Sequence, residues 1–192
     1  MGYPQLKTEK YCYADYLSWD DTTRYEIIEG FPYSMSPGPN RYHQRISIEL
    51  CYRIKSYLQG KTCQVYSAPF DVRLAEKEED ELNTSNVVQP DIAVFCDVSK
   101  LDKQGAVGAP DWVIEILSVS THKKDEHDKL KLYERFKVRE YWIVNPDTKS
   151  IAVYLLKENK FETPQQFYSL DSSIKVSIFP DLSILLKDVF EE

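Results

Sequence analysis

The sequence predicts an α/β protein in which helices cover both faces of a mixed β-sheet. Three apolar runs, at 87–95, 110–118 and 140–144, have the length and composition of buried strands. Few polar residues interrupt them, which is typical of strands that are buried on both faces. Helical patterns at 41–58 and 121–137 supply segments that can cover such a sheet.

The N-terminal part predicts a short helix followed by a β-hairpin. Residues 11–19 form the candidate helix, which ends at turn residues. Residues 24–37 alternate around Glu29-Gly30, as two paired strands would. We expect the helix to pack on the outside of the protein.

A long helix follows the break at Pro37-Gly38-Pro39. Asn40 can cap its first turn, and Gly60 can end it after Leu58. Between these points the apolar residues recur at spacings of three and four, which predicts one buried face. His43 lies on the same face.

The middle of the chain predicts strands joined by polar loops. Residues 63–74 form a strand with a proline kink, and 87–97 form the next strand. Between them, 76–81 carry five acids and one lysine, which is typical of a solvated loop. A linker containing Gly105 and Gly108 leads to the strand at 110–118.

The last third predicts a helix, a hairpin and a closing segment. The helix runs from about 121 to 137, and the hairpin at 140–156 turns at Asn145-Pro146-Asp147. Short strands and an apolar segment complete residues 157–192. We expect one domain over 1–192, with a core at about 24–156 and extra β-hairpins at both ends.

Composition indicates a globular protein that does not bind nucleic acid broadly by charge. The 192 residues are 42% hydrophobic and carry a net charge of −7. The four cysteines form no CxxC pair, which predicts reduced thiols and a cytoplasmic location. No apolar run approaches membrane-spanning length, so we expect no membrane association. The motifs GxSxG, GxxxxGK[ST] and HExxH are absent from the sequence.

Two acids within apolar strands are the main functional signal. Asp91 and Glu115 each interrupt a run that should be buried, and burying an ionised carboxylate is costly without a partner. Two such acids on neighbouring strands can share a hard cation, Mg²⁺ or Mn²⁺. The backbone carbonyl of Ile116 could add a ligand. The pattern predicts a metal centre that activates water for phosphodiester hydrolysis.

Lys129 is the candidate cation of this site. It shares the core-facing stripe of the 121–137 helix, whereas Lys131 lies about 200° around the helix and should face water. A lysine near the reacting water can position it and stabilise negative charge. Asp125, one turn earlier, can pair with Lys129.

Each of these residues also has a purely structural interpretation. Asp91 follows a proline, where an aspartate can cap a turn. Lys129 can extend its ammonium group to solvent from the edge of the stripe. His43 can be a packed histidine, and Asp125 can be a charge in the first turn of the helix. Glu115 is the residue that a structural role explains least well.

The motifs together resemble a known family. Pro90-Asp91 followed by Glu115-Ile116-Leu117 resembles the PD-(D/E)xK nuclease motif. The wider string of YEIIEG, QPDIAVF, APDWVIEILSVST and EYWIVNP resembles the Uma-two family, a restriction-endonuclease-like group regarded as nucleases. The resemblance extends from about Tyr25 to Phe190. Leu117 departs from the motif, because a lysine is expected there.

The resemblance implies a restriction-endonuclease-like fold and a Mg²⁺-dependent endodeoxyribonuclease acting on DNA. Asp91 and Glu115 would be the metal ligands, and Lys129 would replace the strand lysine. Glu26 and His43 match family positions near the site and would add a ligand or a phosphate contact. A homodimer is expected, because cutting a duplex takes two cleavages. The alternative is a non-catalytic module, binding nucleic acid or protein, that has kept the fold; the net charge and Leu117 favour it.

Overall fold

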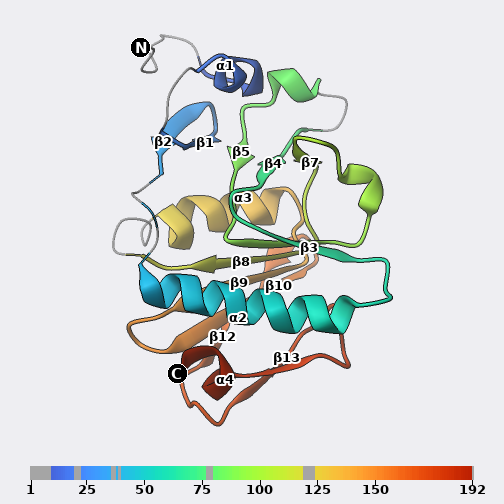
Figure 1. Ribbon diagram of the computed structural model, residues 1–192. Coiled ribbons are helices and arrows are strands. Elements are labelled where there is room, and N and C mark those ends of the chain that lie inside the picture. Colours follow the sequence, from blue (N-terminus) through green and yellow to red (C-terminus); the bar gives the residue numbers. More distant parts are fainter. Residues whose placement is uncertain are drawn as a thin grey trace.

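The computed structural model describes residues 10–19, 23–35, 38, 40–76, 80–118 and 124–191, and of 124–126 only the backbone (Figure 1). Within these residues the strands form a seven-stranded sheet, a five-stranded sheet and a two-stranded pair. The two larger sheets meet at the candidate site, so their construction decides where its side chains lie.

The seven-stranded sheet forms the centre of the fold. Its strands are β3 (Gln64–Ser67), β6 (Ile92–Phe95), β8 (Trp112–Ile116), β9 (Glu140–Asn145), β10 (Ser150–Lys157), β11 (Lys160–Phe161) and β12 (Gln165–Phe167). Their order is β11-β10-β9-β8-β6-β3, with β12 beside β10. Strands β8 and β9 are parallel, whereas the other pairs are antiparallel. A parallel pair needs a crossover connection, and α3 lies in that connection.

Helices cover both faces of this sheet, as predicted. On one face, α2 (Arg41–Leu58) and α4 (Leu186–Phe190) pack on alternate residues of the central strands, such as Ile114 and Val144. On the other face, α3 (Leu130–Arg135) packs on the intervening residues, such as Val113. Figure 1 shows α2 and α3 on opposite sides of β8 and β9. Both faces are therefore apolar, which is why the strands read as continuous hydrophobic runs.

Helix α2 begins and ends where the sequence predicts. The Asn40 side chain accepts a hydrogen bond from the backbone N–H of His43 at 2.9 Å, which caps the first turn. The apolar residues Ile46, Leu50 and Ile54, one turn apart, are buried against the sheet. The opposite side of the helix faces solvent.

The five-stranded sheet is built from short strands of the N-terminal half. It contains β1 (Tyr25–Ile28), β2 (Phe31–Ser34), β4 (Asp71–Arg73), β5 (Val87–Val88) and β7 (Gly105–Val107), in the order β2-β1-β5-β4-β7. The short helix α1 (Tyr13–Leu17) and a 3-10 turn at Glu81–Asn83 contact each other beside it. The predicted hairpin is confirmed: its turn residues Glu29 and Gly30 have φ values of 53° and 82°. Two positive φ values in succession match the twist of the flanking strands.

Two segments predicted as single strands are each divided between the two sheets. Residues 87–95 form β5 in the smaller sheet and β6 in the larger one, separated by Gln89-Pro90-Asp91. Residues 63–74 form β3 and β4, separated at the cis peptide Ala68-Pro69. Proline has no N–H for a ladder hydrogen bond, so each proline falls where the chain leaves one sheet. Asp91 therefore lies at the junction of the sheets and not inside a strand.

The stretch predicted as a linker also contains structure. A 3-10 turn at Val98–Lys100 precedes β7, which pairs with β4 in parallel. Gly105, at φ 143°, approaches the Asp71 carbonyl oxygen so closely that a Cβ there would lie 2.1 Å from it. The glycine that suggested a loop is thus required by close strand pairing.

The C-terminal part closes the core beneath α2. Strands β13 (Ser173–Lys175) and β14 (Ser183–Leu185) form the predicted extra hairpin, and α4 follows directly. No helix in the described part of the chain is long and apolar enough to cross a membrane.

The prediction of four reduced thiols is wrong for two of them. Cys63 and Cys96 form a disulfide. They lie one residue beyond the β3–β6 pair Gln64 and Phe95, so strand register places them opposite each other. Sequence spacing carries no information about this cross-strand neighbour. Cys12 and Cys51 are free.

Candidate active site

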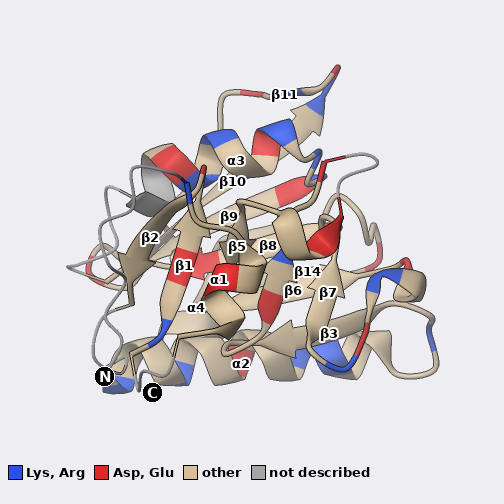
Figure 2. Cartoon of the chain, turned by 90° about the horizontal axis from the view of Figure 1, so that it is seen from above, with Lys and Arg blue, Asp and Glu red and all other residues tan. Residues whose placement is uncertain are grey.

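Acidic residues occur on strands of the sheets as well as on helices and loops (Figure 2). The one on β8 is Glu115, whose exposed fraction is 3%. Its Oε1 accepts hydrogen bonds from Lys129 Nζ and Tyr133 OH, each at 2.8 Å. The carboxylate is therefore compensated by a cation and a hydroxyl, as a buried charge requires.

Lys129 points into the protein, as its position on the helical stripe predicts. It lies at the end of the π-helical turn Lys124–Lys129, directly before α3, and is 3% exposed. Its Nζ is 2.8 Å from Glu115 Oε1 and 2.9 Å from Glu26 Oε1. The predicted alternative of a solvent-directed lysine is wrong. The Asp125 side chain lies outside the described residues, so its predicted pairing with Lys129 stays a prediction.

Glu26 joins the N-terminal hairpin to this site. It lies on β1, is 1% exposed, and accepts a hydrogen bond from the backbone N–H of Gln89 at 2.9 Å as well as contacting Lys129. The Gln89 side chain in turn donates to Asp71 and Tyr16. Glu26 was predicted as a site residue from the family resemblance alone, because the sequence YEII has the pattern of an ordinary short strand.

Asp91 lies at the junction of the sheets, directly before β6. Its Oδ2 accepts a hydrogen bond from the backbone N–H of Ile116 at 2.7 Å and lies 3.2 Å from His43 Nε2. Ile92 pairs with Ile114 in the β6–β8 register, so the next position places Asp91 beside Glu115. His43 comes from the first turn of α2, where it is buried.

The structure places the predicted residues in two separate groups. Glu115 and Glu26 share Lys129, while Asp91 contacts His43 and the backbone of Ile116. In these contacts Ile116 takes part through its backbone N–H, which donates to Asp91. The metal-binding role predicted for its carbonyl stays a prediction.

Tyr133 is a site residue that the sequence prediction assigned only to packing. It is fully buried and follows Lys129 by four residues, so both side chains lie on one helical face. Burial raises the pKa of Tyr133 well above its usual value, and the negative charge of Glu115 acts in the same direction. The hydroxyl therefore remains a donor. An i, i+4 tyrosine beside a predicted buried lysine is the signal that could have identified it.

Carboxylate oxygens suit a hard cation, although the described residues form no large ligand cluster. Over the described ranges, no three Asp, Glu, His or Cys side chains are grouped so as to hold a metal ion. Mg²⁺ is commonly held by only one or two carboxylates, with water completing its shell. Asp91 and Glu115 supply one carboxylate each from adjacent positions of the β6–β8 register, and their role as metal ligands stays a prediction.

The fold is similar to that of a crystallised protein from Anabaena variabilis ATCC 29413, described as a "putative nuclease". The likeness covers 93% of this chain and 97% of that chain, with a TM-score of 0.75 and 21% sequence identity. This similarity confirms the predicted mixed α/β fold.

Residues 13–187 match the Uma2 family, described as "Putative restriction endonuclease", and the chain belongs to that family. The resemblance predicted from the motifs is confirmed. A relative from Synechocystis sp., described as an uncharacterized protein, is 27% identical over 155 residues. The match spans 79% of this chain and 75% of the relative.

Proposed function

We propose that this protein is a metal-dependent endonuclease that hydrolyses phosphodiester bonds of DNA, with Mg²⁺ or Mn²⁺ as cofactor. The observation that carries the proposal is the position of Lys129. The strand position where the motif expects lysine is Leu117, and a lysine from the following helix reaches Glu115 instead. An acid on each of two adjacent strand ends and a convergent lysine are the parts that such hydrolysis needs.

Each residue has a defined role in this proposal. Asp91 and Glu115 would hold the cation, with the Ile116 carbonyl as a further ligand. A bound cation lowers the pKa of its water and offsets negative charge on the phosphate. Lys129 donates hydrogen bonds from Nζ to the attacking water or to a non-bridging phosphate oxygen, and Glu26 fixes the position of that ammonium group.

Hydrolysis then exchanges one phosphorus–oxygen bond for another. The water oxygen bonds to phosphorus while the bond to the leaving oxygen breaks, and the proton lost by water balances the proton gained by the leaving group. His43, held 3.2 Å from Asp91, keeps that carboxylate oriented. Because two strands of a duplex are cut, we expect a homodimer to present two such sites.

The second candidate is a non-catalytic binding or interaction module that keeps the nuclease fold. The burial of Glu115 and Lys129 favours it, since each is 3% exposed and a phosphate must reach both. The net charge of −7 also opposes a long DNA contact surface. The two candidates differ in one property, which is cation binding at Asp91 and Glu115.

Calorimetric titration with Mg²⁺ and Mn²⁺ separates the candidates. Wild type should bind a cation, and Asp91→Ala and Glu115→Gln should each lose that binding. Asp147→Ala, in an exposed turn after β9, is the matched control and should bind normally. Circular dichroism checks folding. Glu115→Gln should fold, because Lys129 keeps its contact with Glu26.

Cleavage of supercoiled plasmid DNA then tests the reaction. The metal-binding variants and Lys129→Met should lose cleavage, while Asp147→Ala should retain it. Absence of cation binding in folded wild type would refute the nuclease proposal and leave the binding module.

A further inference from the structure

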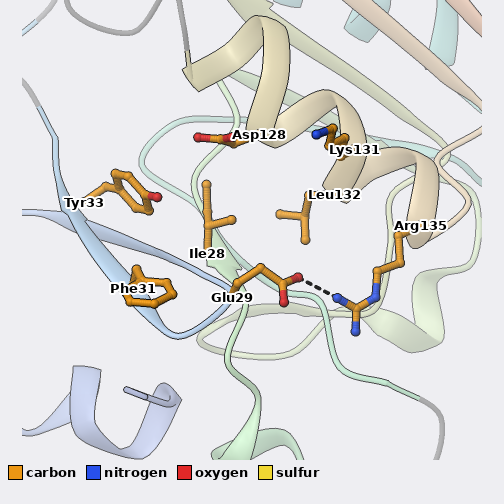
Figure 3. Close-up of a pocket in the computed structure, with 8 residues that line it drawn as sticks. All are labelled: Ile28, Glu29, Phe31, Tyr33, Asp128, Lys131, Leu132 and Arg135. Carbon is orange, nitrogen blue, oxygen red and sulfur yellow. Dashed lines mark hydrogen bonds and ion pairs between the residues drawn. The ribbon is translucent and has the colours of Figure 1, made fainter. Parts of the chain in front are cut away.

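A pocket of about 290 Å³ lies between the β1–β2 hairpin and one face of the helix that carries Lys129. Its helical wall is formed by residues 128, 131, 132 and 135, which recur at spacings of three and four and so face one way. Figure 3 shows Phe31 and Tyr33 on the hairpin side, Lys131 and Arg135 on the helix side, and apolar residues between them.

The pocket is built on the two elements that meet at the candidate active site. Ile28, in its apolar centre, follows Glu26 by two residues on β1, so its side chain points the same way. Leu132, beside it, follows Lys129 by three residues, or less than one helical turn. Along β1, the two-residue step from Glu26 to Ile28 is about 7 Å. A ligand in the pocket would therefore lie next to the Glu26–Lys129–Glu115 group.

Its hairpin wall presents an aromatic ring to solvent. Phe31 is 58% exposed, whereas the hydrophobic residues nearby on β1 are buried. The Glu29-Gly30 turn, with both φ values positive, fixes the ring's position at the start of β2. An exposed aromatic ring held by a tight turn is a surface on which a planar group can stack.

Its helical wall carries Lys131, and the Asp128 carboxylate lies on the same wall. Lys131 Nζ lies 3.1 Å from His127 Nε2, and across the described parts of the chain it forms no ion pair with Asp or Glu. Arg135 differs, because it pairs with Glu29 and Glu76 and so cancels the charge of Glu29 at the rim. Lys131 is thus the cation of this wall that is not held in an ion pair with a described residue and can contact an anionic group of a ligand.

We propose that this pocket binds one unpaired nucleotide of a DNA strand, with its base stacked on Phe31 and its phosphate contacting Lys131. This inference rests on the proposed function, whose substrate it narrows to DNA with a single-stranded segment. A base within a duplex is already stacked on its neighbours and offers no free face to a ring. The pocket's volume lies at the small end of ligand sites, which suits one nucleotide.

Binding through a single stacked base is also consistent with the negative net charge of the chain. Broad duplex binding relies on many lysine and arginine contacts to phosphate, which a net charge of −7 disfavours. Stacking one base on an aromatic ring depends little on net charge. The pocket therefore provides DNA recognition that the overall charge does not prevent.

The test is fluorescence anisotropy with a short labelled single-stranded DNA and its duplex, at low salt and with EDTA to prevent cleavage. The variants are Phe31→Ala and Lys131→Gln. Matched controls on the opposite face of the sheet are Tyr52→Ala, which also removes an exposed ring, and Lys55→Gln on the same helix.

Wild type should bind the single strand more tightly than the duplex. Phe31→Ala should weaken single-strand binding at least about fivefold, the lower end of the loss of one base–aromatic stack. Lys131→Gln should make the slope of log affinity against log salt shallower by about 0.7, as expected for one phosphate contact on a single strand. The control variants should match wild type.

Equal affinity of Phe31→Ala and Tyr52→Ala would overturn the proposal, as would failure of wild type to bind the single strand. These outcomes are independent of the metal-centre test. If Phe31→Ala binds the single strand normally and still cleaves DNA, while Asp91→Ala does not cleave it, the nuclease proposal is supported and the pocket proposal is refuted. If single-strand binding depends on Phe31 but neither wild type nor any variant cleaves DNA, the pocket proposal is supported and the nuclease proposal is refuted.

Discussion

Replacement of Lys129 by methionine should destabilise the protein strongly, because it leaves two buried carboxylates without their shared cation. The Nζ lies 2.9 Å from Glu26 and 2.8 Å from Glu115, and the exposed fractions of the two acids are 1% and 3%. At an effective dielectric constant of 20, each contact corresponds to roughly 6 kcal/mol of attraction, most of which desolvation offsets. Removing one partner of a buried ion pair typically costs about 3–5 kcal/mol.

Urea denaturation should show that loss, which is a large part of a typical unfolding free energy of about 5–15 kcal/mol. The deficit should shrink as pH falls, because each carboxylate that is protonated removes one uncompensated negative charge from the folded state. Adding Glu115→Gln to Lys129→Met should recover stability, since only one buried acid then remains. Lys131→Met, at an exposed position two residues later, should change stability by less than about 0.5 kcal/mol.

A Lys129→Met variant that unfolds within about 1 kcal/mol of wild type at neutral pH would refute this reasoning. So would a deficit that does not depend on pH, because that would indicate lost packing and not uncompensated charge. The double variant separates the two causes again: lost packing would persist when Glu115 becomes glutamine.

Three further predictions concern other parts of the structure. Tyr133→Phe removes a buried donor to the Glu115 carboxylate and should cost about 1–3 kcal/mol in urea denaturation. Burial and a nearby carboxylate raise the pKa of Tyr16 to about 12, so the stability that it contributes is complete below pH 10 and is lost as pH rises through 12. Tyr16→Phe should therefore flatten the fall in stability over that range. Reduction of the Cys63–Cys96 disulfide, with a sequence separation of 33, should lower the unfolding free energy by about 3–4 kcal/mol and raise the titrated thiols from two to four.

The element types were predictable from the sequence because periodicity and capping are local. Asn40 and the apolar spacing after it identify α2, and the Glu29-Gly30 pair identifies the first hairpin. The division of 87–95 between two sheets was not predicted. Both halves are apolar and buried, so only Pro90 marks the break, and proline alone does not show that the next strand enters another sheet.

The acids and the lysine were predictable because charge on an apolar face needs a partner. Glu115 interrupts a buried strand, and Lys129 lies on a helical stripe facing it. Their partner Glu26 could not be derived in that way. It lies 89 residues before Glu115, and the contact depends on how β1 is placed against α3, which no local pattern records.

Because Lys129 comes from the helical segment and not from strand β8, different elements determine the position of its ammonium group. A lysine at position 117 would be held by the same strand as Glu115, and only that sheet would position it. Lys129 is instead held between Glu115 on β8 and Glu26 on the hairpin, so its position depends on both sheets and on the helix. The pocket between the hairpin and the helix is lined by residues of the same two elements. The contact between Glu26 and Lys129 therefore depends on the same packing of hairpin against helix that forms the pocket.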